Sequence, residues 1–428
     1  MGEFEESLGY LGAERDLLLK ALEKGEQNKI AILDERLYGE EEAKRRFPFL
    51  TPDPNVKGGF SYDASIKLGA SLSYFAGAFS IQDPSSALPA ALLSPLRGER
   101  VLDMCAAPGG KSIQIALAIG DSGLLIANDK SHSRALSLSS NLERMGLGNA
   151  IVTCFDLLRD SPFPSGYFDA ILLDAPCSGE AMFRKDEEAR RDWSLAKVSS
   201  CAQTQASLLE VAAKLLRPGG RMVYSTCSFA YEEDIGMVKG FLSRHSDFRP
   251  LCPISDERIF RHADFPEAAY CLPHRYPGEG QFACLLIKEG NEERRNPRLS
   301  KTQISSKAKE RLSALGLASY SFASNQEAIY ACSQPFPVSR FIRYGYQALL
   351  LPRFEPSNGV KRLLPKLTLS EKEAILFLQG QELPMPGEGY VCAYYAALPL
   401  GIGKLGNGKM KNRLPKGLRR RFAKEELI

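Results

Sequence analysis

Short apolar runs and amphipathic stretches alternate through the central part of the chain, from about residue 77 to residue 288. The apolar runs RVLDM, GLLIAND, AIVTC, DAILLD and RMVYSTC have the length and composition of buried strands. Amphipathic stretches at 112–119, 133–145 and 198–216 predict helices. This alternation predicts an α/β fold built on a Rossmann-like, doubly wound sheet.

The regions on either side have a different character. Residues 1–75 combine a helical pattern at 14–22 with a polar stretch containing Pro and Gly around 49–59. Residues 289–312 are charged and contain serine, which is typical of an exposed linker or a solvated helix. Runs such as YQALLL and YVCAYYAALPLG then predict a compact module rich in strands. We therefore expect four parts: an N-terminal segment (1–75), a central domain (76–288), a linker with an intermediate subdomain (289–356) and a C-terminal module (357–428).

Composition excludes several classes of protein. The 428 residues are enough for about two to three domains. Hydrophobic residues at 44% and charged residues at 25% are ordinary for a soluble protein, and no apolar stretch reaches membrane-spanning length. The acidic N-terminus lacks the basic and apolar segments of a signal peptide. We therefore expect a cytoplasmic protein that makes no contact with a membrane.

The distribution of charge is more informative than the net charge of +4. From Gly401 to the end, the chain carries nine lysines or arginines and two glutamates. Such a tail can be a solvated charged segment, but glycines among the cations let the backbone approach a ligand. We therefore favour binding of nucleic-acid phosphates.

The ten cysteines do not form a C-x-x-C pair, and only four histidines accompany them. No structural metal site is therefore expected. In a reducing compartment most cysteines are small buried hydrophobic residues. We assign this packing role to Cys154, Cys201, Cys252, Cys271, Cys284, Cys332 and Cys392.

The segment VLDMCAAPGGKS, residues 101–112, predicts a strand, a turn of small residues and the start of a helix. Gly109 and Gly110 allow close backbone approach to a cofactor, whose polar groups can face the free N–H groups of the helix. The G-x-x-x-x-G-K-[ST] spacing of a P-loop is absent, so the sequence gives little support for binding of a nucleoside triphosphate. Asp129 ends the next apolar run, where ribose-binding carboxylates lie in doubly wound folds. Asp156 follows a further strand and could accept a hydrogen bond from an adenine amino group, while Cys105 is expected to pack inside the turn.

Two further cysteines follow apolar runs. Asp174 and Cys177 come after DAILLD, and Cys227 comes at the end of RMVYSTC. Carboxyl ends of parallel strands face one crevice, so two thiols and a carboxylate could meet on one substrate. Either cysteine alone would be an ordinary buried residue, but the pair together with the cofactor turn predicts a catalytic site.

PCSG around Cys177, STCS around Cys227 and the turn AAPGGK resemble the RNA cytosine-5 methyltransferases of the Nol1/Nop2/Sun family. FSIQDPSS, FRKD, Trp193, QASLLEVA and LRPGG also match this family. The resemblance implies a Rossmann-like methyltransferase domain whose cofactor is S-adenosylmethionine. It assigns cofactor binding to Cys105, Ala106, Ala107, Pro108, Gly109, Gly110, Lys111, Asp129, Asp156 and Asp174.

The same resemblance implies roles in catalysis. Cytosine C5 is a weak nucleophile, and addition of a thiolate at C6 activates it toward a sulfonium methyl group. By similarity, Cys227 is that nucleophile and Cys177 assists release of the methylated base. Asp174 would contact the pyrimidine near N3, and Lys111 would assist orientation. The division of roles between the cysteines comes from the family and not from their spacing.

The C-terminal pattern GxxKxxNGxxKNxxPKGLRR resembles the PUA-like module of the RsmF branch of rRNA methyltransferases. LPHRYPGEGQFACLLIK at 272–288 also resembles that branch, which implies methylation of 16S rRNA near the decoding centre. We separately expect the protein to be a monomer. The N-terminal segment would position the RNA. Contacts with RNA are assigned to Lys404, Lys409, Lys411, Arg413, Lys416, Arg419 and Arg420.

One part of the family pattern is missing. NKIAILDERLYG, residues 28–39, stands where many relatives carry R-x-N-T, so RNA positioning by this segment differs from theirs. There is also no long helical N-terminal RNA-binding domain, which argues against the other main bacterial rRNA branch. The alternatives are a tRNA cytosine-5 methyltransferase, a noncatalytic ribosome-assembly factor that binds RNA, and, least supported, a small-molecule methyltransferase.

Overall fold

The computed structural model describes residues 2–24, 28–292, 304–334, 336–338, 340–420 and 422. Its centre is a ten-stranded sheet with the order β11-β12-β13-β9-β8-β5-β6-β7-β16, in which β10 also pairs with β13. The parallel strands are β5 (Arg100–Asp103), β6 (Leu124–Asn128), β7 (Ala150–Thr153), β8 (Phe168–Asp174) and β9 (Leu216–Thr226). The strand order reverses between β5 and β8, which opens a crevice at their carboxyl ends.

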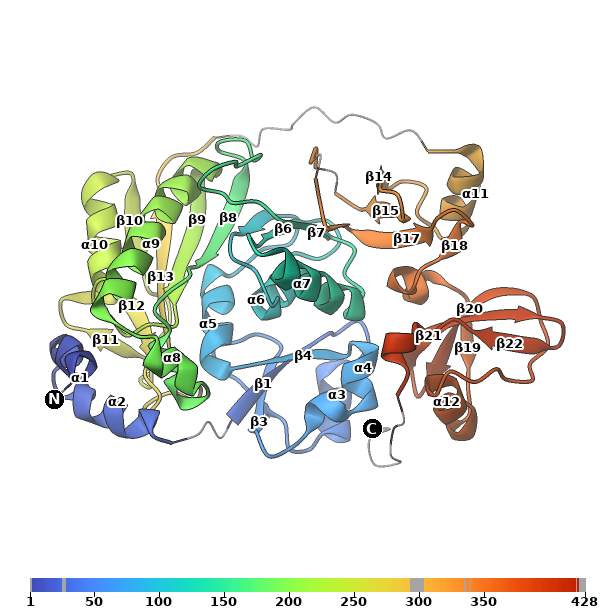
Figure 1. The fold of residues 1–428 in the computed structure, drawn as a ribbon, viewed down its shortest axis with the longest axis horizontal. Coiled ribbons are helices and arrows are strands. Elements are labelled where there is room, and N and C mark those ends of the chain that lie inside the picture. Colours follow the sequence, from blue (N-terminus) through green and yellow to red (C-terminus); the bar gives the residue numbers. More distant parts are fainter. Residues whose placement is uncertain are drawn as a thin grey trace.

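Helices cover both faces of the sheet (Figure 1). Alternate residues of β8 belong to different hydrophobic clusters: Leu172 shares one with residues of α5, and Leu173 shares the other with residues of α9 and α10. Both faces of the parallel strands are therefore buried, which explains their continuous apolar runs. These helices are α5 (Pro84–Leu93), α6 (Gly110–Ile119), α7 (His132–Arg144), α9 (Leu195–Leu215) and α10 (Ile235–Arg244).

The predicted fold class is confirmed, and the predicted helices differ from α6, α7 and α9 by one to three residues at their ends. The largest difference is at the start of α9. The Ser194 side chain accepts a hydrogen bond from the Lys197 backbone N–H and caps this helix before its apolar pattern begins.

Antiparallel strands extend the sheet beyond β9. They are β10 (Phe248–Leu251), β11 (Phe260–His262), β12 (Phe265–Cys271) and β13 (Gln281–Lys288). Phe282 of β13 lies opposite Thr226 of β9. This pairing brings the beginning of β13 to the edge of the sheet where β8 and β9 end.

The N-terminal residues form α1 (Glu3–Ser7), η1 (Leu8–Leu11) and α2 (Glu14–Leu22), and α2 has the bounds predicted from the sequence. A four-stranded sheet follows, with the order β2-β3-β1-β4. Its strands are β1 (Asn28–Leu33), β2 (Thr51–Pro52), β3 (Gly59–Asp63) and β4 (Phe79–Gln82), accompanied by α3 (Glu40–Arg46), η2 (Leu68–Ala70) and α4 (Leu72–Ala76). This sheet continues past residue 75, and β4 leads through Asp83, the N-cap, into α5.

The residues after 303 begin with α11 (Ser306–Ala314), which buries Ala308 and Leu312. Of the two predicted alternatives, an exposed linker and a solvated helix, residues 306–312 form the helix, since most of its side chains are exposed and only these two pack; residues 293–303 lie outside the described residues. A second four-stranded sheet contains β14 (Ser321–Ser324), β15 (Ala328–Cys332), β17 (Tyr346–Leu350) and β18 (Glu355–Pro356). Between β15 and β17, β16 (Arg343–Tyr344) pairs instead with β7 of the central sheet.

The C-terminal module is a sheet of β19 (Lys366–Thr368), β20 (Gly389–Tyr395), β21 (Leu398–Gly406) and β22 (Lys409–Asn412). It also contains η4 (Asn358–Leu363), α12 (Glu371–Leu378) and η5 (Lys416–Leu418). Phe377, Leu400 and Met410 share a hydrophobic cluster with Leu72 and Phe79, so the module packs against the N-terminal sheet. Among the residues described above, no helix is long and apolar enough to cross a membrane.

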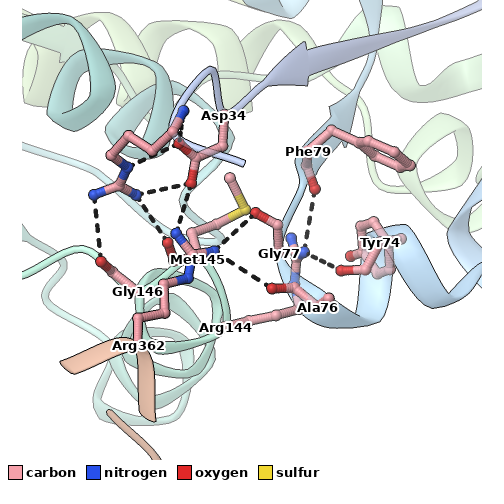
Figure 2. Close-up of polar contacts among 10 residues, drawn as sticks. Asp34, Tyr74, Ala76, Gly77, Phe79, Arg144, Met145, Gly146 and Arg362 are labelled. Atoms are coloured by element: carbon pink, nitrogen blue, oxygen red, sulfur yellow. Dashed lines mark hydrogen bonds and ion pairs between the residues drawn. The ribbon is translucent and has the colours of Figure 1, made fainter. Parts of the chain in front are cut away.

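A polar junction joins the N-terminal sheet, the end of α7 and η4 (Figure 2). Asp34 is fully buried and accepts hydrogen bonds from Arg36 Nε at 2.8 Å and from Arg362 Nη1 at 2.9 Å. Arg362 also donates to the Gly77 carbonyl, and Arg144 donates to the Tyr74 carbonyl. Burial raises the pKa of Asp34, but hydrogen bonds and charge from Arg36 and Arg362 outweigh burial and lower it.

Candidate active site

The turn between β5 and α6 has the backbone geometry that its glycines suggest. Gly109 has a φ of 113°, and a Cβ there would lie 2.7 Å from Leu138 Cδ1. A Cβ on Gly110 would lie 2.5 Å from Gln82 Oε1. Only glycine fits both positions without displacing these neighbours.

Asp103 at the end of β5 fastens the turn to α6. Its Oδ2 accepts a hydrogen bond from Ser112 Oγ at 2.6 Å. Burial raises the pKa of the Asp103 carboxyl to about 7. The start of α6 is thereby held against the carboxyl end of the strand.

A cavity of about 280 Å³ lies beside this turn. It is lined by residues predicted for cofactor binding, namely Cys105, Ala106, Ala107, Pro108, Gly109, Gly110, Lys111 and Asp174. Other lining residues were not predicted as part of the site: Tyr74, Ser80, Ile81, Gln82, Asp83, Ser86, Asn141 and Arg144. Several of these residues belong to the FSIQDPSS segment, residues 79–86, which had been noted only because it matches the family pattern.

Three donors hold the carboxylate of Asp174. Its Oδ1 accepts from Ser225 Oγ at 2.7 Å and from Gln281 Nε2 at 2.9 Å, and its Oδ2 lies 2.7 Å from Lys111 Nζ. Burial would lower the pKa of Lys111, but the charge of Asp174 and their hydrogen bond raise it. The site thus contains a fixed ion pair between Lys111 and Asp174.

The two cysteines predicted to converge lie next to each other. Strands β8 and β9 are parallel neighbours with Asp174 opposite Ser225, so Cys177 and Cys227 follow adjacent strand ends. Their Sγ atoms are 3.1 Å apart, and both side chains are partly exposed. The hydrogen bond with Cys227, followed by burial, raises the pKa of Cys177 well above its usual value.

The other two predicted carboxylates lie outside this cavity. Asp129 follows β6, is 2% exposed, and accepts hydrogen bonds from the backbone N–H groups of Ala107 and Ser131. Asp156 lies beyond the end of β7, has a side chain that is 41% exposed, and accepts from the Leu158 N–H. Both lie on the β6–β7 side of the turn, adjoining it rather than facing Asp174.

The remaining cysteines divide into two groups. Burial raises the pKa of the Cys105 thiol inside the turn. The prediction of buried cysteines is confirmed for Cys271, Cys284, Cys332 and Cys392. It is wrong for Cys154, Cys201 and Cys252, which are only partly buried. Cys154 and Cys252 directly follow strands, and Cys201 lies in the first half of α9.

Within the described ranges, no group of three or more His, Cys, Asp or Glu residues could hold a metal ion.

The cations assigned to RNA lie on β21, β22, η5 and the residues next to them. Most are exposed, but Arg413 Nη2 lies 2.7 Å from a carboxylate oxygen of Glu355, and Lys404 Nζ lies 3.8 Å from the same atom. Lys409 pairs with Glu382. The remaining cations of the set are Lys411, Lys416, Arg419 and Arg420, all exposed.

Comparison with known proteins extends this picture. A family model described as 16S rRNA methyltransferase RsmB/F matches residues 90–287, and one described as the methyltransferase RsmF PUA domain matches residues 364–420. The chain is 31% identical to ribosomal RNA small subunit methyltransferase F of Shewanella sediminis over 415 residues, covering 86% of this chain and 85% of that protein. It is 40% identical to the protein of the same name from Erwinia tasmaniensis over 249 residues, covering 56% and 52%.

Solved structures agree on the fold. A methyltransferase homolog from Pyrococcus horikoshii is 26% identical with a TM-score of 0.57, covering 65% of this chain and 91% of that one. The structure of NSun6 from the same organism with SFG has a TM-score of 0.59 at 20% identity, covering 68% and 99%.

The fold and the site define the class, an RNA methyltransferase of the kind that depends on S-adenosylmethionine. More narrowly, the chain belongs to the RsmB/F family of 16S rRNA methyltransferases and carries an RsmF-type PUA domain. The predicted family and enzyme class are thereby confirmed. The predicted cofactor, S-adenosylmethionine, is the methyl donor of this class.

Proposed function

We propose that the protein methylates carbon 5 of cytosine in 16S rRNA through a covalent adduct between Cys227 and carbon 6 of the base. The observation that carries this proposal is the pair of thiols 3.1 Å apart at adjacent strand ends, beside Asp174. A single reactive cysteine would suffice for adduct formation, and a second one in contact with it suits the release of the product.

The residues around the turn suit S-adenosylmethionine. A glycine cradle that a Cβ would fill allows close backbone approach to the cofactor, and the buried carboxylate of Asp129 beside it suits the ribose hydroxyls. Asp156 would bind the adenine amino group, and residues 105–111 with Asp174 would hold the remainder. When bound, this cofactor supplies the methyl group that is transferred.

In the proposed reaction the chain's own residues handle the base and its protons. The Cys227 thiolate forms a bond to C6, and the electron density gained at C5 makes that carbon nucleophilic. After methylation, a water molecule takes the proton from C5, and the bond between Cys227 and C6 breaks to restore the double bond. Cys227 leaves as a thiolate, and Cys177 assists this release by donating its S–H to that sulfur. Lys111, Ser225 and Gln281 hold Asp174, which in turn orients the pyrimidine ring.

RNA binding would be shared between parts of the chain. We assign the exposed cations of β21, β22 and η5 to phosphate contacts, since such contacts position a protein on RNA without reading its sequence. The target cytosine must leave its stack to reach the thiols. We further propose that the substrate lies near the decoding centre and that the protein acts as a cytoplasmic monomer with its N-terminal segment against the RNA.

Bisulfite sequencing of total RNA from cells with and without the gene tests this function. Loss of one or a few protected cytosines in 16S rRNA on deletion supports the proposal. Loss confined to tRNA would retain the chemistry and overturn the substrate. An unchanged pattern in both RNAs would contradict methylation and favour a noncatalytic assembly factor.

A further inference from the structure

Behind the two cysteines lies a buried cluster of carboxyl and hydroxyl groups that the reaction above does not use. Glu233 and Ser228 are 0% exposed, Glu180 is 1% exposed and Ser178 is 2% exposed. Unpaired acidic groups are costly to bury, so a cluster of this kind needs internal hydrogen bonds.

One carboxyl group connects the two cysteine-bearing segments. The Ser178 backbone N–H donates to both carboxyl oxygens of Glu233, at 3.3 and 3.1 Å, and Ser228 Oγ donates to one of them at 3.2 Å. Gln205 Nε2 donates to the other oxygen at 2.6 Å. Because Ser178 follows Cys177 and Ser228 follows Cys227, Glu233 ties together the segments that set the distance between the thiols.

The hydrogen bonds in this cluster require a shared proton. Ser178 Oγ lies 2.7 Å from Glu180 Oε1 and also contacts Glu233 Oε1. Trp193 Nε1 already donates to Glu180 Oε1 at 2.7 Å. A serine hydroxyl has one proton, so it can donate to one carboxyl only, and the other must be protonated to donate in return. Burial and the charge of Glu180 raise the pKa of Glu233, which favours this arrangement.

We propose that Glu233 is a positioning residue for both thiols, and that the charge it shares with Glu180 keeps the resting proton on Cys177. This inference rests on the proposed function and explains its division of roles. Cys177 then donates its S–H to Cys227, 3.1 Å away, so the thiolate is on Cys227, the nucleophile.

The charged groups near the two thiols differ: carboxyl groups act on Cys177, and a lysine lies near Cys227. The charges of Glu233 and Glu180 add to the Cys227 contact and to burial in raising the pKa of Cys177. Lys111, paired with Asp174, is the cation near Cys227. Titratable groups that face the pair come from several elements: Lys111 on α6, Asp174 on β8, Glu180 on η3 (Glu180–Arg184), Cys201 on α9, Tyr224 on β9 and Glu233 before α10.

Alkylation of the free enzyme by iodoacetamide tests the inference without RNA or cofactor. Mass spectrometry follows Cys177 and Cys227 separately across a pH series in the wild type, in Glu233→Gln and in the control Glu232→Gln, which alters an exposed neighbour. We expect Cys227 to react faster in the wild type and in the control. In Glu233→Gln, Cys177 should react about tenfold faster at a fixed pH for each unit by which its pKa falls.

An unchanged ratio of Cys177 to Cys227 alkylation, with the same pH profile in Glu233→Gln as in the wild type, would overturn the inference. If Glu233→Gln does not fold, Ser228→Ala tests the positioning role instead. This variant removes the hydrogen bond between Glu233 and the residue that follows Cys227, and it leaves the carboxyl group of Glu233 in place. Ser228→Ala should slow Cys227 alkylation at least threefold and leave the Cys177 profile in place, and equal rates would contradict positioning. Glu233→Asp should keep the Cys177 profile. Cytosine methylation is measured separately, so its absence in the wild type would refute the proposed function and not the alkylation result.

Discussion

Replacing Asp34 by asparagine tests the junction that joins the N-terminal sheet, α7 and η4. The Asp34 side chain is fully buried, and its partners Arg36 and Arg362 are 40% and 16% exposed. Removing one partner of a buried ion pair costs about 3–5 kcal/mol, and the exposure of Arg36 places Asp34→Asn near the lower value. With a urea dependence of about 3 kcal/mol per molar, the unfolding midpoint should fall by about 1 M.

The assay is urea unfolding followed by intrinsic fluorescence at pH 7 and at lower pH. The folded-state pKa of Asp34 is lowered, so its stabilising effect is complete above the unfolded value of about 3.9 and is lost as pH falls through the folded value. The difference between wild type and Asp34→Asn should therefore shrink below about pH 4. The matched control is Asp264→Asn, whose side chain is 72% exposed. Equal midpoints for the two variants at pH 7 would show that the buried ion pairs of Asp34 do not stabilise the fold.

Three further predictions concern other parts of the chain. Gly109→Ala should weaken S-adenosylmethionine binding at least tenfold by calorimetry, because its φ of 113° is strained for any other residue and its Cβ would lie 2.7 Å from Leu138 Cδ1; wild-type affinity would contradict the proposed cradle. Burial lowers the pKa of Lys361 to about 8, so the charged lysine destabilises the folded state and Lys361→Met should unfold at a higher temperature than the wild type at pH 7. This difference should shrink as the pH rises from about 8 toward 10.4, the range in which Lys361 loses its proton first in the folded and then in the unfolded chain. A difference that stays constant or changes sign would contradict the destabilising role of Lys361. Arg420→Gln should reduce the slope of log binding constant against log salt concentration for RNA by about one unit, whereas the control Lys372→Gln, at an exposed position on α12, should leave that slope unchanged. The same slope for both variants would show that Arg420 makes no phosphate contact.

Local patterns predicted much of the fold. Buried runs and 3.6-residue periodicity identified the parallel strands and α6, α7 and α9, because each of these elements carries its signal within its own residues. The meeting of Cys177 and Cys227 could also be predicted, since carboxyl ends of neighbouring parallel strands share one edge of a sheet.

Features that depend on distant pairing were missed. Gln281 reaches Asp174 only because β13 pairs antiparallel with β9, and β16 joins β7 through just two residues, Arg343 and Tyr344. The Asp34 junction likewise connects segments that are hundreds of residues apart. Glu233 carried no sequence signal of its own, since its role depends on which loops fold over it.

In the proposed reaction, Cys227 forms the bond to the base and Cys177 assists release of the product. The most direct test incubates wild type, Cys227→Ala and Cys177→Ala with S-adenosylmethionine and 16S rRNA, and then measures both 5-methylcytosine and covalent protein–RNA adducts on denaturing gels. We predict no methylcytosine and no adduct for Cys227→Ala, and a stable adduct for Cys177→Ala because elimination stalls. Wild-type turnover by Cys227→Ala, or an adduct formed by that variant, would contradict the assignment of Cys227 as the nucleophile.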